Sequence, residues 1–398
     1  MFSTLKPVET DPILGLMAAF RADPNPQKID LGVGVYRDDH GHTPILASVK
    51  TAEQQYLASE TTKTYVGMAG DEQYNTAMSQ LILGDVYAAV SERFRTVQTP
   101  GGTGALRVAA EFILRCNPDA SLWVGSPTWA NHWDLFGAAG LPIREYPYYN
   151  CADKDLDADA MLAKLATAGP DDVVLLHACC HNPSGMDPTF AQWEAVCDLA
   201  LERGFLPLVD MAYQGFGDGL DADAAGVRLL AERLPELIVC TSCSKNFGLY
   251  RERIGGCAVL SASQTLADTV KSTLENTVRG IYSMPPHHGA AIVGTILSDP
   301  ELREQWSAEL ALMRDRLNTL RQLMSRQLAQ AGAAGDFSFI ERQKGMFSFL
   351  GITPEQVARL RDEDSIYMVS SGRMNVAGIS HDNVDRFAEA VARVLAQD

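Results

Sequence analysis

Residues 173–211 read VVLLHACCHNPSGMDPTFAQWEAVCDLALERGFLPLVDM and combine two kinds of pattern. The stretches 173–180 and 205–211 are apolar runs, which is typical of strands buried on both faces of a sheet. Between them, residues 190–204 have apolar side chains three and four positions apart and end in glycine, which predicts an amphipathic helix. Strand, helix and strand in this order predict a parallel α/β unit.

The same alternation continues on both sides of this unit. Further apolar runs are SLWVGS (121–126), LIVCTSC (237–243) and GCAVLS (256–261), and polar turns or amphipathic stretches separate them. Residues 100–260 are therefore predicted to form an α/β core, with a mostly parallel central sheet and helices on both faces.

After residue 300 the pattern changes to a long helical stretch over residues 299–332, which predicts one or two amphipathic helices between a start at Asp-Pro and a stop at glycine. The tail then reads as strand (345–350), helix (353–363), strand (366–378) and helix (381–397), which predicts a smaller α+β domain. We expect an N-terminal arm with part of the small domain over 1–44, a large domain over 45–312 and the small C-terminal domain over 313–398.

Charge and composition exclude several classes of protein. The 398 residues include 33 basic and 50 acidic side chains, a net charge of −17, which disfavours binding to nucleic acid or to anionic membranes. No stretch of about 18 apolar residues occurs, and the first residues do not resemble a signal peptide, so we expect a cytoplasmic protein. The eight cysteines lie mostly in apolar runs, so disulfides are not expected.

Functional side chains follow the predicted strands, at the edge where α/β sheets bind ligands. They are Pro127, Trp129, Asn131 and His132 after the first strand, His181, Asn182 and Gly185 after the second, Asp210 and Tyr213 after the third, and Ser242, Ser244 and Lys245 after the fourth. Any one of these residues alone would be read as a turn or cap residue. Their occurrence after four successive strands predicts a site.

Upstream, TPGGTGALRVAAEFIL (99–114) places a glycine-rich turn before a helix, where free N–H groups and the helix dipole favour a phosphate. The turn lacks the G-x-G-x-x-G and Walker patterns, which argues against dinucleotides and nucleoside triphosphates. Lys245 is the other chemical candidate. A partly desolvated lysine beside a second cation, such as Arg253, has a lowered pKa and a nucleophilic amine, although most lysines are solvated surface charges.

The motif SxSKNxGLYxxRxG, from Ser242 to Gly255, resembles the cofactor-lysine signature of class I aminotransferases, in the aspartate and aromatic amino-acid branch. The resemblance runs almost end to end, through DPILGL (11–16), LGVGVY (31–36), TPGGTGALR, HNPSG, DMAYQGF and SSGRMNVAG (370–378). It implies a fold type I transferase with pyridoxal 5′-phosphate as cofactor, bound in the large domain. It also implies a homodimer with active sites at the subunit interface. We expect no metal.

The resemblance assigns cofactor roles residue by residue. Lys245 would carry the cofactor as a Schiff base and then move the proton between the substrate α-carbon and cofactor C4′. Asp210 would keep the pyridine nitrogen protonated, with His132 orienting it from behind. The other predicted contacts are ring stacking by Trp129, hydrogen bonds to the phenolic oxygen from Asn182 and Tyr213, and phosphate binding by Gly102, Thr103, Ser242, Arg253 and Tyr65 of the neighbouring subunit.

Two arginines are implied in substrate binding. Arg373 would pair with the α-carboxylate beside the backbone of Gly34, with Trp129 and Asn182 also at the substrate. Arg279 of the other subunit would bind a distal carboxylate, as in aspartate, glutamate or 2-oxoglutarate. The residues near this arginine depart from the aspartate-selective pattern, because Met284 and Thr64 stand where asparagine is usual.

Both changes remove polar groups that could bind Arg279. We therefore expect transfer of the amino group from tyrosine, phenylalanine and aspartate to 2-oxoglutarate by a ping-pong mechanism. A strict aspartate aminotransferase is the alternative.

Three further interpretations compete. The cysteines of Cys179-Cys180-His181 and Cys240-x-x-Cys243 suggest a metal or redox site, but alternation along a strand predicts that the thiols in each group diverge. A lyase or decarboxylase of the same fold type could use the same lysine and aspartate. A non-catalytic binding or regulatory module is the third, disfavoured by the presence of Lys245, Asp210 and Arg373.

Overall fold

The computed structural model describes residues 2–6 and 12–396. Asp11 of the DPILGL motif and Gln397 of the last predicted helix lie outside these residues. The central sheet has seven strands, in the order β2 (Phe94–Pro100), β10 (Ile254–Leu260), β9 (Leu237–Ser242), β8 (Leu206–Met211), β7 (Asp172–His177), β3 (Ser121–Ser126) and β4 (Ile143–Pro147). β10 runs antiparallel to both its neighbours, and the other described pairings in this sheet are parallel. The prediction of a mostly parallel α/β sheet is confirmed.

Helices cover both faces of this sheet because its strands are apolar on both sides. Along β7, Val173 and Leu175 belong to one hydrophobic cluster, whereas Val174 and Leu176 belong to the other. The first cluster is completed by α5 (Gly101–Cys116), α6 (Asn131–Ala139) and α10 (Gln264–Ile281). The second is completed by α3 (Glu72–Leu83), α7 (Ala158–Leu165), α8 (Phe190–Arg203) and α9 (Ala225–Arg233).

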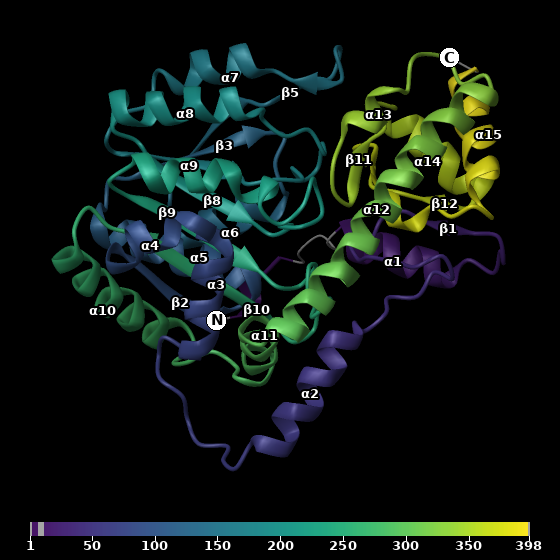
Figure 1. The fold of residues 1–398 in the computed structure, drawn as a ribbon. Helices are drawn as coiled ribbons and strands as arrows, with labels where there is room; N and C mark the ends of the chain where they lie inside the picture. The colour runs from purple at the N-terminus through teal and green to yellow at the C-terminus, as the bar shows by residue number, and fades with distance from the viewer. Residues whose placement is uncertain (1, 7–11, 397–398) are drawn as a thin grey trace.

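A second group of elements lies to the right of the sheet in Figure 1. It contains α1 (Pro12–Ala22), β1 (Ile29–Asp30), α13 (Phe339–Arg342), β11 (Phe347–Phe349), α14 (Pro354–Asp364), β12 (Ile366–Tyr367), β13 (Arg373–Asn375) and α15 (Val384–Leu395). β1 pairs with β12, so a segment near the N-terminus lies among C-terminal elements. The predicted strand over 366–378 is in fact two strands, because the chain turns at Gly372, where φ is +79°.

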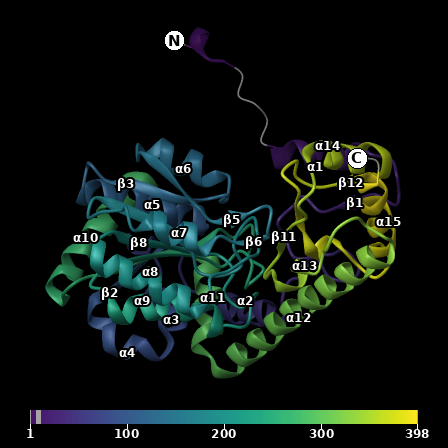
Figure 2. The same cartoon turned by 90° about the horizontal axis from the view of Figure 1, so that it is seen from above.

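One long helix connects the two groups. α12 (Pro300–Gln330) packs against α2 (Ala47–Ser59) and α11 (His288–Ser298), and also against α13 and α15. Figure 2 shows it along one edge of the molecule, from the sheet side to the C-terminal elements. Besides short 3-10 helices, the remaining described elements are α4 (Tyr87–Val90), β5 (Tyr149–Asn150) and β6 (Asp155–Leu156). None of the described helices combines the length and the apolar character needed to cross a bilayer.

Candidate active site

A cavity of about 220 Å³ opens at the carboxyl ends of β7, β8 and β9 and reaches the N-terminus of α5. Segments far apart in the sequence meet there, because parallel strands bring all their carboxyl ends to one edge of the sheet. The predicted residues that line it are Gly34, Gly102, Thr103, Trp129, Asn182, Asp210, Tyr213, Ser242, Ser244, Lys245, Arg253 and Arg373.

Lys245 occupies the turn after β9, where its side chain is half-buried. Burial lowers the pKa of this amine to about 8, and the positive charges of Arg253 and Arg373 act in the same direction, against the opposing effect of Asp210. Its Nζ lies 5.4 Å from the centre of the Tyr213 ring. A lysine with this pKa has a substantial neutral fraction near neutral pH, so it can attack a carbonyl group.

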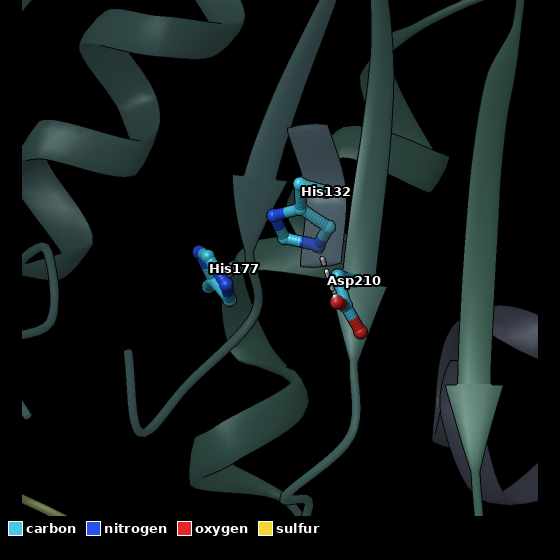
Figure 3. Close-up of side chains that lie close together, drawn as sticks. All are labelled: His132, His177 and Asp210. Carbon is cyan, nitrogen blue, oxygen red and sulfur yellow. Dashed lines mark hydrogen bonds and ion pairs between the residues drawn. The ribbon is translucent and has the colours of Figure 1, made fainter. Parts of the chain in front are cut away.

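Asp210, near the end of β8, is 7 % exposed and meets His132 from the start of α6. His132 Nε2 lies 3.1 Å from Asp210 Oδ2, and its Nδ1 lies 2.8 Å from the Thr128 hydroxyl, as Figure 3 shows for the first pair. Burial alone would raise the pKa of Asp210, but the hydrogen bond and charge of His132, with His177 and Lys245, hold it below the ordinary value. The cavity therefore contains a fixed carboxylate anion, suited to a protonated ring nitrogen.

The N-terminus of α5 forms an anion cradle in the wall of the same cavity. The residue before the helix is Pro100, whose side chain makes no capping hydrogen bond, so the N–H groups of the first turn remain available to a ligand. A Cβ at Gly101, where φ is +73°, would come 2.5 Å from Arg253 Nη2, so only glycine allows this approach. Ser242 faces Gly102 across the gap, and Arg253 Nη1 donates to Ser244 Oγ at 3.3 Å. These groups fit a phosphate dianion.

Arg373 approaches the cavity from β13, on the side of the C-terminal elements. It is 7 % exposed, and its Nη2 donates to the Gly32 carbonyl at 2.9 Å. Its guanidinium lies 4.4 Å from the centre of the Phe347 ring, and the same ring lies so close to Gly34 that a Cβ there would clash at 2.8 Å. A planar cation held in this way suits a carboxylate, which it can bind through two parallel hydrogen bonds.

Three more predicted residues complete the wall. Asn182 and Tyr213 are buried, and burial raises the pKa of the Tyr213 phenol well above its usual range, so the phenol stays a hydrogen-bond donor. Trp129 presents its ring at 84° to His132, with the ring centres 5.3 Å apart. The cavity thus combines a flat aromatic side chain, an amide and a phenol with its charged groups.

Tyr65 and Arg279 do not line this cavity. Tyr65 is 92 % exposed on the segment between α2 and α3, and Arg279 lies exposed in the last turn of α10, where it donates to Ser283. Phosphate binding by Tyr65 and carboxylate binding by Arg279 in the site of a neighbouring subunit therefore stay predictions.

Several residues that line the cavity were not predicted from the sequence, among them His177, Phe347 and Ile13. His177 is the last residue of β7, and its position at a strand end was a signal that could have found it. Burial, and then the charge of His132, lower its pKa to about 4, so its ring is neutral at neutral pH. Phe347 lay within a predicted strand, and nothing in the sequence showed that its ring would lie under Arg373.

One prediction about the cysteines was wrong. Cys179 and Cys180 do not diverge, because β7 ends at His177 and Cys180 has a left-handed φ of 53°, so strand alternation no longer applies. Their thiols lie within 4.8 Å of each other and of Asp223. The pKa of both thiols is raised, that of Cys179 by its hydrogen bond to Cys180 and by burial, and that of Cys180 to about 12 by burial. Protonated thiols are poor metal ligands.

Cys240 and Cys243 face different surroundings, as expected. Cys240, in β9, lies opposite Cys257 of the neighbouring strand β10, whereas the Cys243 sulfur lies 3.6 Å from the Tyr74 hydroxyl. All eight cysteines are in the described part of the chain and carry free thiols.

Known proteins resemble this chain over almost its whole length. Residues 26–391 match the family model for aminotransferase class I and II. The chain is 50 % identical to the aspartate aminotransferase of Salmonella typhi, with 99 % of this chain and 100 % of the relative covered. It is also 50 % identical to the aromatic-amino-acid aminotransferase of Pseudomonas aeruginosa, with 99 % of each chain covered.

A solved structure agrees with these relatives. The aromatic-amino-acid aminotransferase of Burkholderia pseudomallei, covalently bound to pyridoxal phosphate, has a TM-score of 0.96 and 43 % identity, with 99 % of each chain covered. The chain belongs to the class I and II aminotransferase family, in the branch of pyridoxal-phosphate-dependent aspartate and aromatic-amino-acid aminotransferases.

Proposed function

We propose that this enzyme transfers the amino group of tyrosine, phenylalanine and aspartate to 2-oxoglutarate, with pyridoxal phosphate held at Lys245. The observation that carries the proposal is the cavity that places Lys245, Asp210 and Arg373 together. When bound, the cofactor supplies an aldehyde that reacts with amines and a ring that accepts the electrons of a deprotonated α-carbon.

The chain's own residues have distinct tasks in this proposal. Gly102, Thr103, Ser242, Arg253 and Tyr65 of a neighbouring subunit would hold the phosphate. Asp210 would keep a proton on the ring nitrogen, because its carboxylate stays ionised and is fixed by His132. Trp129 would lie against the ring, and Asn182 and Tyr213 would donate to its oxygen.

The substrate would be held at its carboxylates. Arg373 and the Gly34 backbone would bind the α-carboxylate, which turns the α-proton toward the amine of Lys245. That amine, neutral near its lowered pKa, would take the proton as general base and later return it as general acid. Arg279 of the partner subunit would bind the distal carboxylate of aspartate or 2-oxoglutarate, and would move aside for an aromatic ring.

The broad substrate range rests on Met284 and Thr64, which offer Arg279 no amide group. Relatives equally similar to this chain are named for aspartate and for aromatic amino acids, so strict aspartate specificity is the alternative. Single-turnover spectroscopy with each donor separates the two. We expect aspartate, tyrosine and phenylalanine each to discharge the absorbance of the lysine-bound cofactor. A kcat/KM for phenylalanine thousands of times below that for aspartate would instead identify a strict aspartate aminotransferase.

The assembly follows from the same proposal. We propose a cytoplasmic homodimer in which residues 45–312 form the large cofactor-binding domain, and residues 1–44 and 313–398 supply the arm and the small domain. The pairing of β1 with β12 supports grouping the first segment with the last. The free cysteines fit a reducing compartment.

A further inference from the structure

Arg321, in the middle of α12, is a cation in the interior of the protein, far along the chain from every predicted site residue. It is 1 % exposed. Its guanidinium donates to three main-chain carbonyls of one short segment, those of Ile340 at 3.3 Å, Gly345 at 2.9 Å and Phe347 at 2.6 Å. Burial lowers its pKa to about 10, so it remains charged at neutral pH. Charge-assisted bonds of this kind are roughly twice as strong as neutral ones.

The segment that Arg321 holds, residues 340–347, packs against the loop that carries Asn182. The Lys344 N–H donates to the Gly185 carbonyl at 2.7 Å. A Cβ at Gly345, where φ is +77°, would come 2.4 Å from the Cys180 Cβ, so these two segments of the chain are in close contact. Arg321 therefore fixes a junction between an element of the sheet edge and an element of the C-terminal group.

The last residue of this segment, Phe347, touches the groups proposed to bind substrate. Its ring lies under the Arg373 guanidinium, against Gly34, and 6.1 Å from the Tyr213 ring at an angle of 80°. β11 also pairs with β13, with Phe349 opposite Arg373. A shift of the carbonyls bound by Arg321 would thus move the surface on which Arg373 rests.

We propose that Arg321 is a positioning residue for the substrate carboxylate. It clamps residues 340–347 so that Phe347 holds Arg373 and the Gly34 backbone at the correct depth beside Lys245. This inference rests on the proposed function, in which Arg373 binds the α-carboxylate. It concerns carboxylate affinity and not the cofactor chemistry, because none of Arg321's hydrogen bonds goes to Asp210, Lys245 or the α5 cradle.

The test uses the cofactor-loaded enzyme and the binding of succinate, a dicarboxylate that has no amino group to transfer. Arg321→Met should raise the dissociation constant of succinate and the KM for aspartate by about tenfold or more, because a displaced Arg373 would lose one charged hydrogen bond to the carboxylate. The absorbance of the bound cofactor and its pH midpoint should not change. Arg321→Lys keeps the charge but not the forked geometry. Its dissociation constant for succinate should lie between those of the parent enzyme and Arg321→Met.

Two controls separate positioning from stability. Leu328→Ala removes a buried side chain two turns further along α12 and should lower Tm without changing succinate affinity. Arg326→Ala, at an exposed position of the same helix, should change neither. If Arg321→Met does not fold, Arg321→Lys and Phe347→Leu replace it, and both should weaken succinate binding.

The outcomes that overturn the inference are distinct from those that overturn the proposed function. Succinate affinity within about twofold of the parent enzyme in the Arg321 and Phe347 variants, or an equal loss in Leu328→Ala, would contradict the positioning role. Arg373→Lys serves as the reference, since it should lower kcat/KM for all substrates and weaken succinate while leaving cofactor absorbance intact. If Arg373→Lys has no effect, the proposed carboxylate site itself is wrong.

Discussion

His132 Nε2 lies 3.1 Å from Asp210 Oδ2, and the other ring nitrogen of His132 is held by the Thr128 hydroxyl. The histidine therefore has a fixed orientation behind a carboxylate that faces the cavity. Burial raises the pKa of Asp210, but the hydrogen bond and charge of His132 outweigh this effect and keep the pKa low. An anion that would otherwise be costly inside the protein is thus available to the cofactor.

Replacing His132 with phenylalanine should weaken cofactor binding. The variant keeps a ring of similar size but removes one hydrogen bond to the buried carboxylate, a loss of roughly 1.5–3 kcal/mol, or about tenfold or more in the dissociation constant of pyridoxal phosphate. Equilibrium dialysis of the apoenzyme measures it. Trp133→Phe, at the exposed neighbouring position, is the control, and equal affinities in both variants would contradict the role of His132.

The lowered pKa of Lys245 predicts the pH at which the apoenzyme captures its cofactor. Only the neutral amine attacks an aldehyde, so the capture rate should rise with pH and level off above about 8, whereas an ordinary lysine would level off above about 10.4. Asp210 raises this pKa, so Asp210→Asn should move the midpoint to lower pH. Stopped-flow absorbance across a pH series gives both midpoints. A midpoint near that of an ordinary lysine would contradict the account.

The breadth of substrate range should depend on Met284 and Thr64. The double variant Met284→Asn with Thr64→Asn gives Arg279 amide partners, which should hold it in place for a distal carboxylate. We expect the ratio of kcat/KM for phenylalanine over aspartate to fall by about tenfold, the value of one hydrogen bond to a charged group. Steady-state kinetics with both donors measures this ratio. An unchanged ratio would show that other residues set the range.

The exposure of Arg279 and Tyr65 in the single chain leads to a test of shared sites. Lys245→Ala and Arg279→Ala proteins should each be nearly inactive with aspartate. Mixed and reassembled, they should regain about a quarter of parental activity, because half of random dimers are mixed and each has one restored site. Mixing without prior dissociation is the control. No recovery would mean that Arg279 acts within its own chain.

The sheet and most of the cavity could be predicted because they depend on local patterns. Apolar runs fix the strands, and strand ends of parallel strands must meet, so Asp210, Tyr213 and Lys245 could be placed without a structure. The clamp at Arg321 could not be predicted in this way. Its partners are main-chain carbonyls about twenty residues away, which leave no mark in the sequence, and an arginine in a long amphipathic helix is usually solvent-exposed.

The cysteine error has a related cause. Alternation of side chains holds only while the chain stays extended, and the left-handed conformation of Cys180 ends it. That conformation is stabilised from a distance, since Asp187 accepts hydrogen bonds from the N–H groups of Cys180 and His181 at 2.7 and 2.9 Å. Side-chain alternation therefore cannot be used to predict side-chain directions in a short loop with its own hydrogen bonds.

The most direct test of the central claim is borohydride reduction of the cofactor-loaded enzyme, followed by peptide mapping with mass spectrometry. The account predicts that the reduced cofactor is attached to the peptide that contains Lys245. After prior addition of aspartate without an oxo acid, the protein should carry no attached cofactor, because the amino group has moved to it. Attachment to another lysine, or attachment at Lys245 that aspartate does not abolish, would contradict the account.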